Sequence, residues 1–276
     1  MIRHPLSPWT QRLVTLALGL VLALSLGACA PKIQQDQILP ADAVWALFSQ
    51  GRNAARLSTA GFVAAGSMNY AGPDKSMRVV LEFWGNPGYP LRMDMSAGFG
   101  TPIALWHENA KGIRGYFPQE RKLYTHGDPR AGAARMGLGI PLSLFDLAAM
   151  ICGTYDGLVP KGYSAANPMD EGGFRYEFYG QGPVSSLTLD ATGRPMVFAG
   201  QLQGHGWTLE ASNFDQESAL PDPRRFLLTM KSGVTAVIRV KRLERRTAPW
   251  VASALKLEVP PGTLIVQLEM VETSAQ

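Results

Sequence analysis

The sequence has few of the residues on which enzyme and metal chemistry usually depends. It contains two cysteines and four histidines among 276 residues, and the histidines stand singly, without metal-ligand spacing. The patterns Gly-x-Ser-x-Gly, His-Glu-x-x-His, Cys-x-x-Cys and Gly-x-x-x-x-Gly-Lys are all missing. These absences argue against the common hydrolases, zinc proteases, thiol oxidoreductases and phosphate-loop proteins. We therefore predict that the chain is not an enzyme and holds no metal or dissociable cofactor.

One short catalytic pattern does occur, Ser253-Ala254-Leu255-Lys256, which matches Ser-x-x-Lys. A pattern with two fixed positions arises often by chance, and its usual companions Ser-Asp-Asn and Lys-Thr-Gly are missing. An esterase that uses Ser253 remains an alternative, and unchanged behaviour of a Ser253→Ala variant would exclude it.

The charge balance is small. The chain has 26 basic and 22 acidic residues, a net charge of +4. Residues 1–28 carry two of the basic residues and no acidic one, so their removal leaves 24 − 22 = +2. A balance this slight is ordinary solubility chemistry, and it predicts no nucleic-acid partner.

The N-terminus carries an export signal. The apolar run from Leu13 to Ala28 follows a short basic start and is too short to span a membrane as a helix. It ends in Leu26-Gly27-Ala28-Cys29, which resembles the lipobox of bacterial lipoproteins. The resemblance implies that residues 1–28 are removed and that Cys29 receives diacylglycerol and an N-linked acyl chain such as palmitate. Residues 29–40 then form a lipid-anchored tether.

The residue after Cys29 and the second cysteine of the chain extend this interpretation. In many Gram-negative bacteria an aspartate after the lipidated cysteine favours retention in the inner membrane, whereas this chain has Ala30. We therefore expect the protein on the periplasmic face of the outer membrane. The second cysteine, Cys152, has no partner left, and its apolar neighbours predict a buried, unreactive thiol.

Residues 41–246 have the pattern of one mainly β domain. A helix is expected from Ala41, with Val44, Leu47, Phe48, Gly51 and Ala55 on one stripe. Strands with short connections follow, which predicts an antiparallel sheet. The expected strands are 61–70, 76–84, 89–96, 102–108, 112–117, 121–124, 174–179, 184–190, 195–200, 207–211, 225–230 and 235–243. Helices are expected at 129–136 and 142–151, and residues 247–276 form an extension with two short strands, near 255–259 and 264–270.

Alternation of apolar and polar side chains gives the predicted sheet one apolar face. In the second and third strands this face comprises Met77, Val79, Leu81, Phe83, Leu91, Met93 and Met95. The same parity adds Ile103 and Leu105 from the fourth strand, and Leu142 and Phe145 lie on the apolar stripe of the second short helix. The order of elements predicts a curved antiparallel sheet, an open half-barrel, covered by short helices.

Several ordered motifs resemble the LolA/LolB-like lipoprotein-sorting family. They comprise Thr59-Ala60-Gly61-Phe62, Glu82-Phe83-Trp84, Tyr89-Pro90-Leu91-Arg92, the turn from Ser96 to Thr101, Met136 to Leu142, and Leu220-Pro221 before a strand pair. The resemblance implies a half-barrel of about eleven strands around a hydrophobic cavity for acyl chains. The eleven apolar residues of the preceding paragraph would line that cavity.

The resemblance also implies partners and a membrane contact. The cargo would be acylated lipoproteins, received from a LolA-like periplasmic carrier and inserted into the outer membrane by this chaperone-like protein. Gly98, Phe99 and Gly100 stand where the family has a projecting apolar loop that enters the bilayer, although Gly-Phe-Gly replaces the typical Pro-Leu-Gly. The alternative is a structural or envelope-assembly lipoprotein that uses the same fold to bind a protein partner or free lipid.

Overall fold

The structure is a computed structural model that describes residues 39–73, 76–180, 182–202, 204–216, 220 and 222–268. The predicted signal, Cys29 and almost all of the tether lie outside these residues. Within the described part of the chain, no helix combines the length and apolar character needed to cross a membrane.

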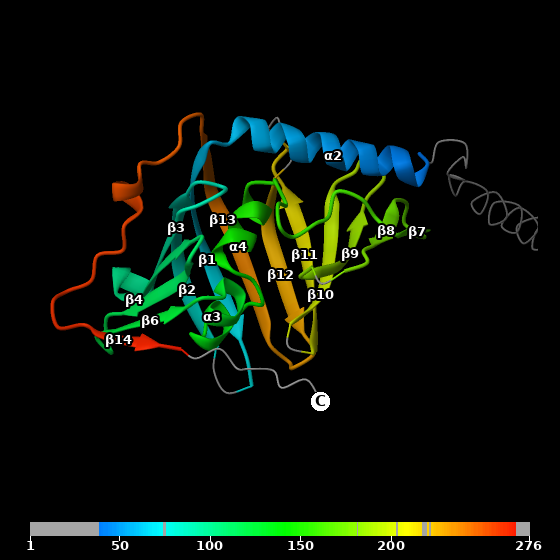
Figure 1. Cartoon of the computed structure of the whole chain (residues 1–276). Helices are drawn as coiled ribbons and strands as arrows, with labels where there is room; N and C mark the ends of the chain where they lie inside the picture. The colour runs from blue at the N-terminus through cyan, green and yellow to red at the C-terminus, as the bar shows by residue number, and fades with distance from the viewer. Residues whose placement is uncertain are drawn as a thin grey trace, which may run out of the picture. The chain divides into compact units, whose positions relative to one another are not determined.

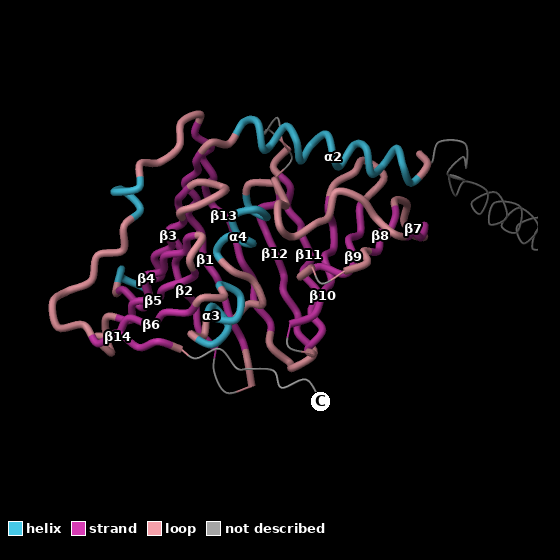
Figure 2. Tube along the Cα trace, viewed as in Figure 1, coloured by secondary structure: helices cyan, strands magenta, loops and turns pink. Residues whose placement is uncertain are grey.

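One sheet of fourteen strands forms the frame of the protein (Figures 1 and 2). Its strand order is β14-β6-β5-β4-β3-β2-β1-β13-β12-β11-β10-β9-β8-β7, and every pair is antiparallel except β14 with β6. The strands are β1 (Gly61–Ala71), β2 (Ser76–Gly85), β3 (Leu91–Ser96), β4 (Pro102–Asn109), β5 (Gly112–Phe117), β6 (Lys122–His126), β7 (Ala165–Pro168), β8 (Phe174–Glu177), β9 (Val184–Leu189), β10 (Pro195–Leu202), β11 (His205–Phe214), β12 (Pro223–Met230), β13 (Thr235–Arg246) and β14 (Leu264–Gln267).

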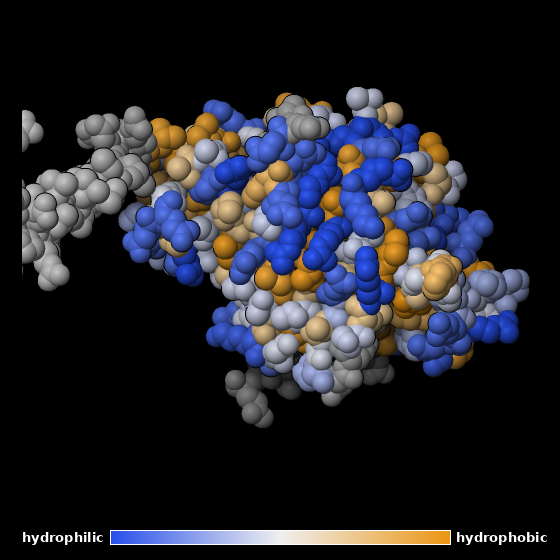
Figure 3. All heavy atoms as spheres, turned by 180° about the vertical axis from the view of Figure 1, so that it is seen from behind, coloured by the Kyte–Doolittle hydropathy of each residue, from blue (hydrophilic) through white to orange (hydrophobic). Residues whose placement is uncertain are grey.

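Three α-helices lie on one side of this sheet (Figure 1): α2 (Ala41–Ser58), α3 (Pro129–Arg135) and α4 (Leu144–Ile151). Helix α3 packs on β5 and β6, and α4 packs on β3 and β4. The other side, seen in Figure 3, is largely hydrophilic. A curved, open antiparallel sheet covered by short helices is therefore confirmed, with more strands than the family resemblance implies.

The predicted apolar stripe of α2 is divided between two environments. Val44, Phe48 and Ala55 are buried in the core, as expected. Leu47 and Gly51 are exposed, because the buried stripe is rotated toward Trp45.

The start of α4 differs from the prediction by two residues. The helix was expected from Leu142, after Pro141, and it begins at Leu144. Ser143 is the N-cap, because its hydroxyl accepts from the Asp146 N–H while the Asp146 carboxylate accepts from the Ser143 N–H. This reciprocal capping box satisfies two backbone donors that a start at Leu142 would leave to other partners.

The placement of Leu105 was predicted wrongly. The β3–β4 register pairs Met95 with Ala104 and then Ser96 with Pro102, so one residue of β4 is skipped. Past this bulge, Ala104 and Trp106 face the main core. Leu105 therefore points to the opposite face, where it packs against Tyr116, Leu123 and Leu257.

The C-terminal extension forms one of its two predicted strands within the described residues. β14 pairs in parallel with β6 and lengthens the sheet. Around 255–259 there is instead a short 3-10 turn, η3 (Ala252–Leu255), followed by irregular chain. Leu257 from this stretch is buried against the outer face of the sheet.

The predicted burial of Cys152 is confirmed, and that burial raises the pKa of its thiol to about 12.

Candidate functional site

Most residues predicted to line an acyl cavity lie in a filled core beneath α4. Met77, Ile103 and Phe145 are partly buried against that core, and Leu105 lies on the other face. The fully buried members are Val79, Leu81, Phe83, Leu91, Met93, Met95 and Leu142. Leu147 and Ile151 of α4 close over Leu81, Phe83 and Met93 and leave a cavity of about 10 Å³. This is about the space of one water molecule, so an acyl chain enters here only if α4 moves.

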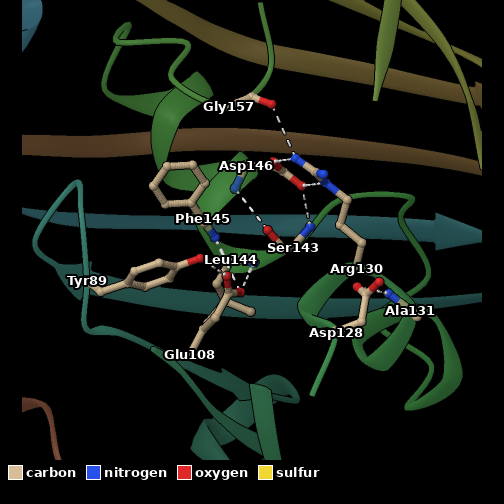
Figure 4. Close-up of polar contacts among 10 residues, drawn as sticks. All are labelled: Tyr89, Glu108, Asp128, Arg130, Ala131, Ser143, Leu144, Phe145, Asp146 and Gly157. Carbon is tan, nitrogen blue, oxygen red and sulfur yellow. Dashed lines mark hydrogen bonds and ion pairs between the residues drawn. The ribbon is translucent and has the colours of Figure 1, made fainter. Parts of the chain in front are cut away.

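A buried carboxylate holds the first turn of α4 (Figure 4). Glu108 of β4 is 0% exposed. Its Oε2 accepts hydrogen bonds from the backbone N–H of Leu144 at 2.7 Å and of Phe145 at 3.4 Å. The Tyr89 hydroxyl donates to Oε1 at 3.2 Å, and the Tyr89 ring packs against Phe145 with centroids 5.2 Å apart. Two free donors at the helix start are thereby satisfied by a side chain of the sheet.

An ion pair ties α4 to α3. Arg130 of α3 donates from Nε and Nη2 to the two oxygens of Asp146, at 2.7 and 2.6 Å. It also donates to the Gly157 carbonyl at 3.3 Å. Asp128 caps α3 by accepting from the Ala131 N–H at 3.0 Å. Because Asp146 is fully buried and bonded on both oxygens, α3 and α4 are held as a pair over the sheet.

The protonation of Glu108 follows from its burial. Loss of solvent raises the pKa of Glu108 to about 7, although the N–H donors of Leu144 and Phe145 oppose the rise. Burial also raises the pKa of Tyr89, so its phenol keeps its proton and remains a donor to Glu108. The carboxyl group therefore changes charge near neutral pH.

Replacing Glu108 by glutamine will remove a pH-dependent part of the stability. The pKa of this carboxyl group is 4.5 in the unfolded chain, its ordinary value, and about 7 in the folded protein. Between these two pH values the unfolded chain loses the proton while the folded protein retains it. The folded state then binds more protons, so the free energy of unfolding of the native protein falls as pH rises, by about 3 kcal/mol from this group. Urea unfolding at pH 4 and pH 8 measures this fall. The fall should be smaller by that amount in Glu108→Gln, and equal falls in the two proteins would contradict the assignment.

A larger cavity lies beside α2. Its volume is about 390 Å³, within the range of small-ligand pockets. The wall is mostly apolar, with Leu47, Phe48 and Ala54 from α2. The remaining lining residues are Gln50, Gly51, Arg52, Ala55, Gly153, Tyr155, Thr192, Gly193, Arg194, Pro195, Leu220 and Asp222.

Two arginines support this cavity. Arg52 Nη1 donates to the carbonyls of Val159 and Pro160, each at 3.1 Å, and so fixes the loop after α4 to α2. Arg245 of β13 forms a bidentate pair with Asp222 at 2.7 and 2.6 Å, and it also donates to the Cys152 carbonyl at 3.1 Å. Sequence reasoning missed this cavity. Its one visible signal was Gly51, a residue without a side chain in the apolar stripe of a helix.

The Gly-Phe-Gly turn projects from the sheet between β3 and β4. Phe99 has a relative exposure of 111%, and its backbone takes a left-handed conformation with φ 64°. A Cβ placed on Gly98 or Gly100 would meet nothing within 4 Å. The Ala97 N–H donates to the Thr101 carbonyl at 2.8 Å and closes the base of the turn. Since a left-handed conformation is uncommon for a bulky residue, the turn keeps a large apolar ring in solvent at some conformational cost.

The described residues contain no cluster of three or more histidine, cysteine, aspartate or glutamate side chains that could hold a metal. Ser253 and Lys256 lie at η3, and the hydrogen bond between them joins the Lys256 N–H to the Ser253 carbonyl at 3.4 Å. A nucleophile and its base need a side-chain contact. The backbone hydrogen bond at η3 therefore gives the Ser253 alternative no support.

Solved structures of other proteins resemble this fold. No family model matches the sequence, and no curated protein matches it. A LolA superfamily protein from Nitrosomonas europaea has a similar structure, with a TM-score of 0.56 and 12% identity over 79% of this chain and 98% of that chain. The chain has a LolA-like fold. A DUF1329 family protein from Desulfovibrio piger is also similar, with a TM-score of 0.54 and 12% identity over 79% of this chain and 99% of that chain. At such identities the likeness concerns the LolA-like fold and not a particular activity.

Proposed function

We propose that the protein is a LolB-like lipoprotein receptor, anchored through Cys29 to the periplasmic face of the outer membrane. It takes the acyl chains of lipoproteins from a LolA-like carrier and passes them into the bilayer. The observation that carries this proposal is Phe99, a fully exposed aromatic ring on a strained turn flanked by two unobstructed glycines. The strained backbone and the open glycines present this ring to whatever lies outside the protein, and for a lipid-anchored domain the nearest apolar partner is the membrane.

The cavity beside α2 is the proposed acyl site of the closed form. Its apolar wall and its volume of about 390 Å³ suit part of an alkyl chain. Further chains require the space beneath α4, which is filled in this form. Movement of α4 would break the contacts of Glu108 and Asp146, so these two carboxylates set the cost of opening.

A second candidate function is a structural or assembly lipoprotein that binds a protein or a single free lipid. The observation that favours it is the filled interior beneath α4, because a carrier of three acyl chains needs more room. The two functions predict different results in a test of cargo transfer to liposomes. A receptor deposits acylated cargo in liposomes, whereas an assembly protein keeps its ligand.

Filling the cavity beside α2 tests the acyl site. A side chain at Gly51 meets no atom within 4 Å of its Cβ, so Gly51→Leu should occupy the cavity without strain. Leucine also forms helices better than glycine, so α2 should not weaken. Because about two methylene groups of ligand contact are displaced, binding of a fluorescent triacylated lipopeptide should weaken at least tenfold.

The matched control is Gly51→Ala, which supports the helix equally well but leaves most of the cavity open. It should bind the lipopeptide as the native protein does. Native affinity in Gly51→Leu would place the acyl chains elsewhere and contradict the site.

A further inference from the structure

A second hollow lies on the outer side of the sheet, away from α3 and α4. Its volume is about 580 Å³, and it is bounded by the β4–β5 turn and by η3 of the C-terminal extension. His107 points into it, whereas the next residue, Glu108, points to α4 on the other side. Tyr89 also lines the hollow, so this site and the anchor of α4 share one residue.

Basic side chains form a row across three strands at this place. The register pairs Arg92 of β3 with His107 of β4, and His107 with Arg114 of β5. A positive charge on His107 would lie directly opposite both arginines, which is destabilising. Arg92 is compensated by Asp94 at 2.6 Å. Arg114 instead meets the His107 ring, with its Nη2 3.3 Å from Nδ1.

The His107 ring is held neutral by these surroundings. Burial, followed by the charges of Arg114 and Arg92, lowers the pKa of His107 to about 4. Because a guanidinium can only donate hydrogen bonds, Nδ1 is the acceptor and the ring proton lies on Nε2. The ring therefore orients Arg114 without adding or removing charge at physiological pH.

Two lysines complete a cationic lining. Lys111 from the β4–β5 turn and Lys256 after η3 border the same hollow as Arg114. None of the described residues that line it is an aspartate or a glutamate. The carboxylate nearest to Lys256 is Glu258, 3.9 Å away, and the two side chains are 68% and 82% exposed. Such an exposed pair contributes little, so within the part of the chain that the structure describes, three positive charges border one hollow without a strong acidic partner.

The positive charges and hydrogen-bond donors of this lining indicate an anionic ligand. Two lysines and a donor fork from arginine match the charge and the several acceptor oxygens of a phosphate group. Tyr89, Pro90, Ala110 and Ala252 supply apolar walls beside the charges. We propose that this hollow binds a phosphate group through Arg114, Lys111 and Lys256, carried either by a lipid headgroup or as free phosphate. This site is separate from the acyl cavity and does not depend on lipoprotein transfer.

Calorimetric titration of the full chain with two probes tests the site and distinguishes the sources. The probes are dihexanoyl phosphatidic acid and inorganic phosphate, with dihexanoylglycerol as the ligand that lacks phosphate. Tighter binding of phosphatidic acid than of phosphate, in the native protein and in Gly51→Leu alike, assigns the site to a lipid headgroup, and equal or weaker binding assigns it to free phosphate. Dihexanoylglycerol should not compete in either case.

Arg114→Gln should weaken binding of the better probe at least tenfold, since a charge-assisted contact is removed. The matched control is Arg78→Gln, an exposed arginine of β2 outside the hollow, which should bind as the native protein does. If Arg114→Gln fails to fold, Lys256→Gln replaces it, because that side chain is mostly exposed and its loss should weaken binding several-fold. Failure of both probes to bind, or native affinity in the folded variants, would overturn the site.

Discussion

Replacing Phe99 by glutamate will reduce deposition of lipoprotein cargo in liposomes at least tenfold, while cargo binding stays at its native level. Burial of a phenylalanine side chain in an apolar medium is worth about 1.5–3 kcal/mol, and the variant loses this and adds a charge that the bilayer interior rejects. Because the ring touches little of the protein, the free energy of unfolding should change by no more than about 0.5 kcal/mol.

The measurement follows a fluorescent triacylated lipopeptide from the protein into liposomes, with cargo binding determined separately. Phe99→Leu keeps an apolar side chain and should retain most of the transfer. Tyr179→Glu is the matched control, because Tyr179 is another exposed aromatic residue, 90% exposed, at a different place in the fold. Transfer that is intact in Phe99→Glu, or equally impaired in Tyr179→Glu, would remove the Gly-Phe-Gly turn from the membrane step.

Replacing Asp146 by alanine will lower the free energy of unfolding by about 3 kcal/mol, the lower end of the range for breaking a buried ion pair. The variant loses both bonds to Arg130 and the bond that the Asp146 carboxylate accepts from the Ser143 N–H, whereas the backbone N–H of residue 146 still donates to the Ser143 hydroxyl. The lower end applies because Arg130 is partly exposed and water can solvate its freed guanidinium. Urea unfolding monitored by fluorescence measures the change.

Asp156→Ala is the matched control for this variant. Asp156 pairs with Arg56, but these side chains are 32% and 47% exposed, so the loss should stay below about 1 kcal/mol. If the two aspartate variants lose equal stability, the ion pair between α3 and α4 is not the principal anchor of α4. Under the proposed function, Asp146→Ala should also take up lipopeptide faster, because α4 opens more readily.

The strands were the most predictable part of the fold. In β2 and β3 every second residue is apolar, and the turns between them contain glycine, proline and asparagine, so strand positions and faces follow from local pattern alone. The four-residue strand β7 was missed, because Ala165–Pro168 contains neither alternation nor a β-branched residue.

The sequence predictions were wrong where tertiary packing or strand pairing overrides the local pattern of apolar residues. Leu105 has the parity of Ile103, yet a skipped residue in the β3–β4 register turns it to the outer face. Whether a bulge forms depends on how two strands fit together, and neither strand encodes this by itself. In the C-terminal extension, the alternation at Leu255 and Leu257 predicted a strand, but the stretch is irregular chain after η3, and Leu257 packs on the outer face of the sheet against Tyr116 and Leu123.

The candidate sites also comprise one that the sequence predicted and several that only the structure revealed. Phe99 was identified from the tripeptide Gly98-Phe99-Gly100, because the two flanking glycines have no side chains against which the aromatic ring could pack. The cavity beside α2, the Glu108 contact with α4 and the basic row from Arg92 to Arg114 were not foreseen. Each joins residues that are far apart in the chain or on different strands, and their distances depend on register and helix placement.

The sequence by itself determined a mainly β chain with one apolar sheet face, short covering helices and a projecting Gly-Phe-Gly turn, because these follow from periodicity and turn chemistry within about ten residues. Only the tertiary structure decided that the apolar face is filled by α4 and that cavities lie beside α2 and on the outer side of the sheet. The reason is physical: side-chain volumes summed across distant segments decide whether a concave sheet encloses space or a packed core, and no local pattern carries that sum.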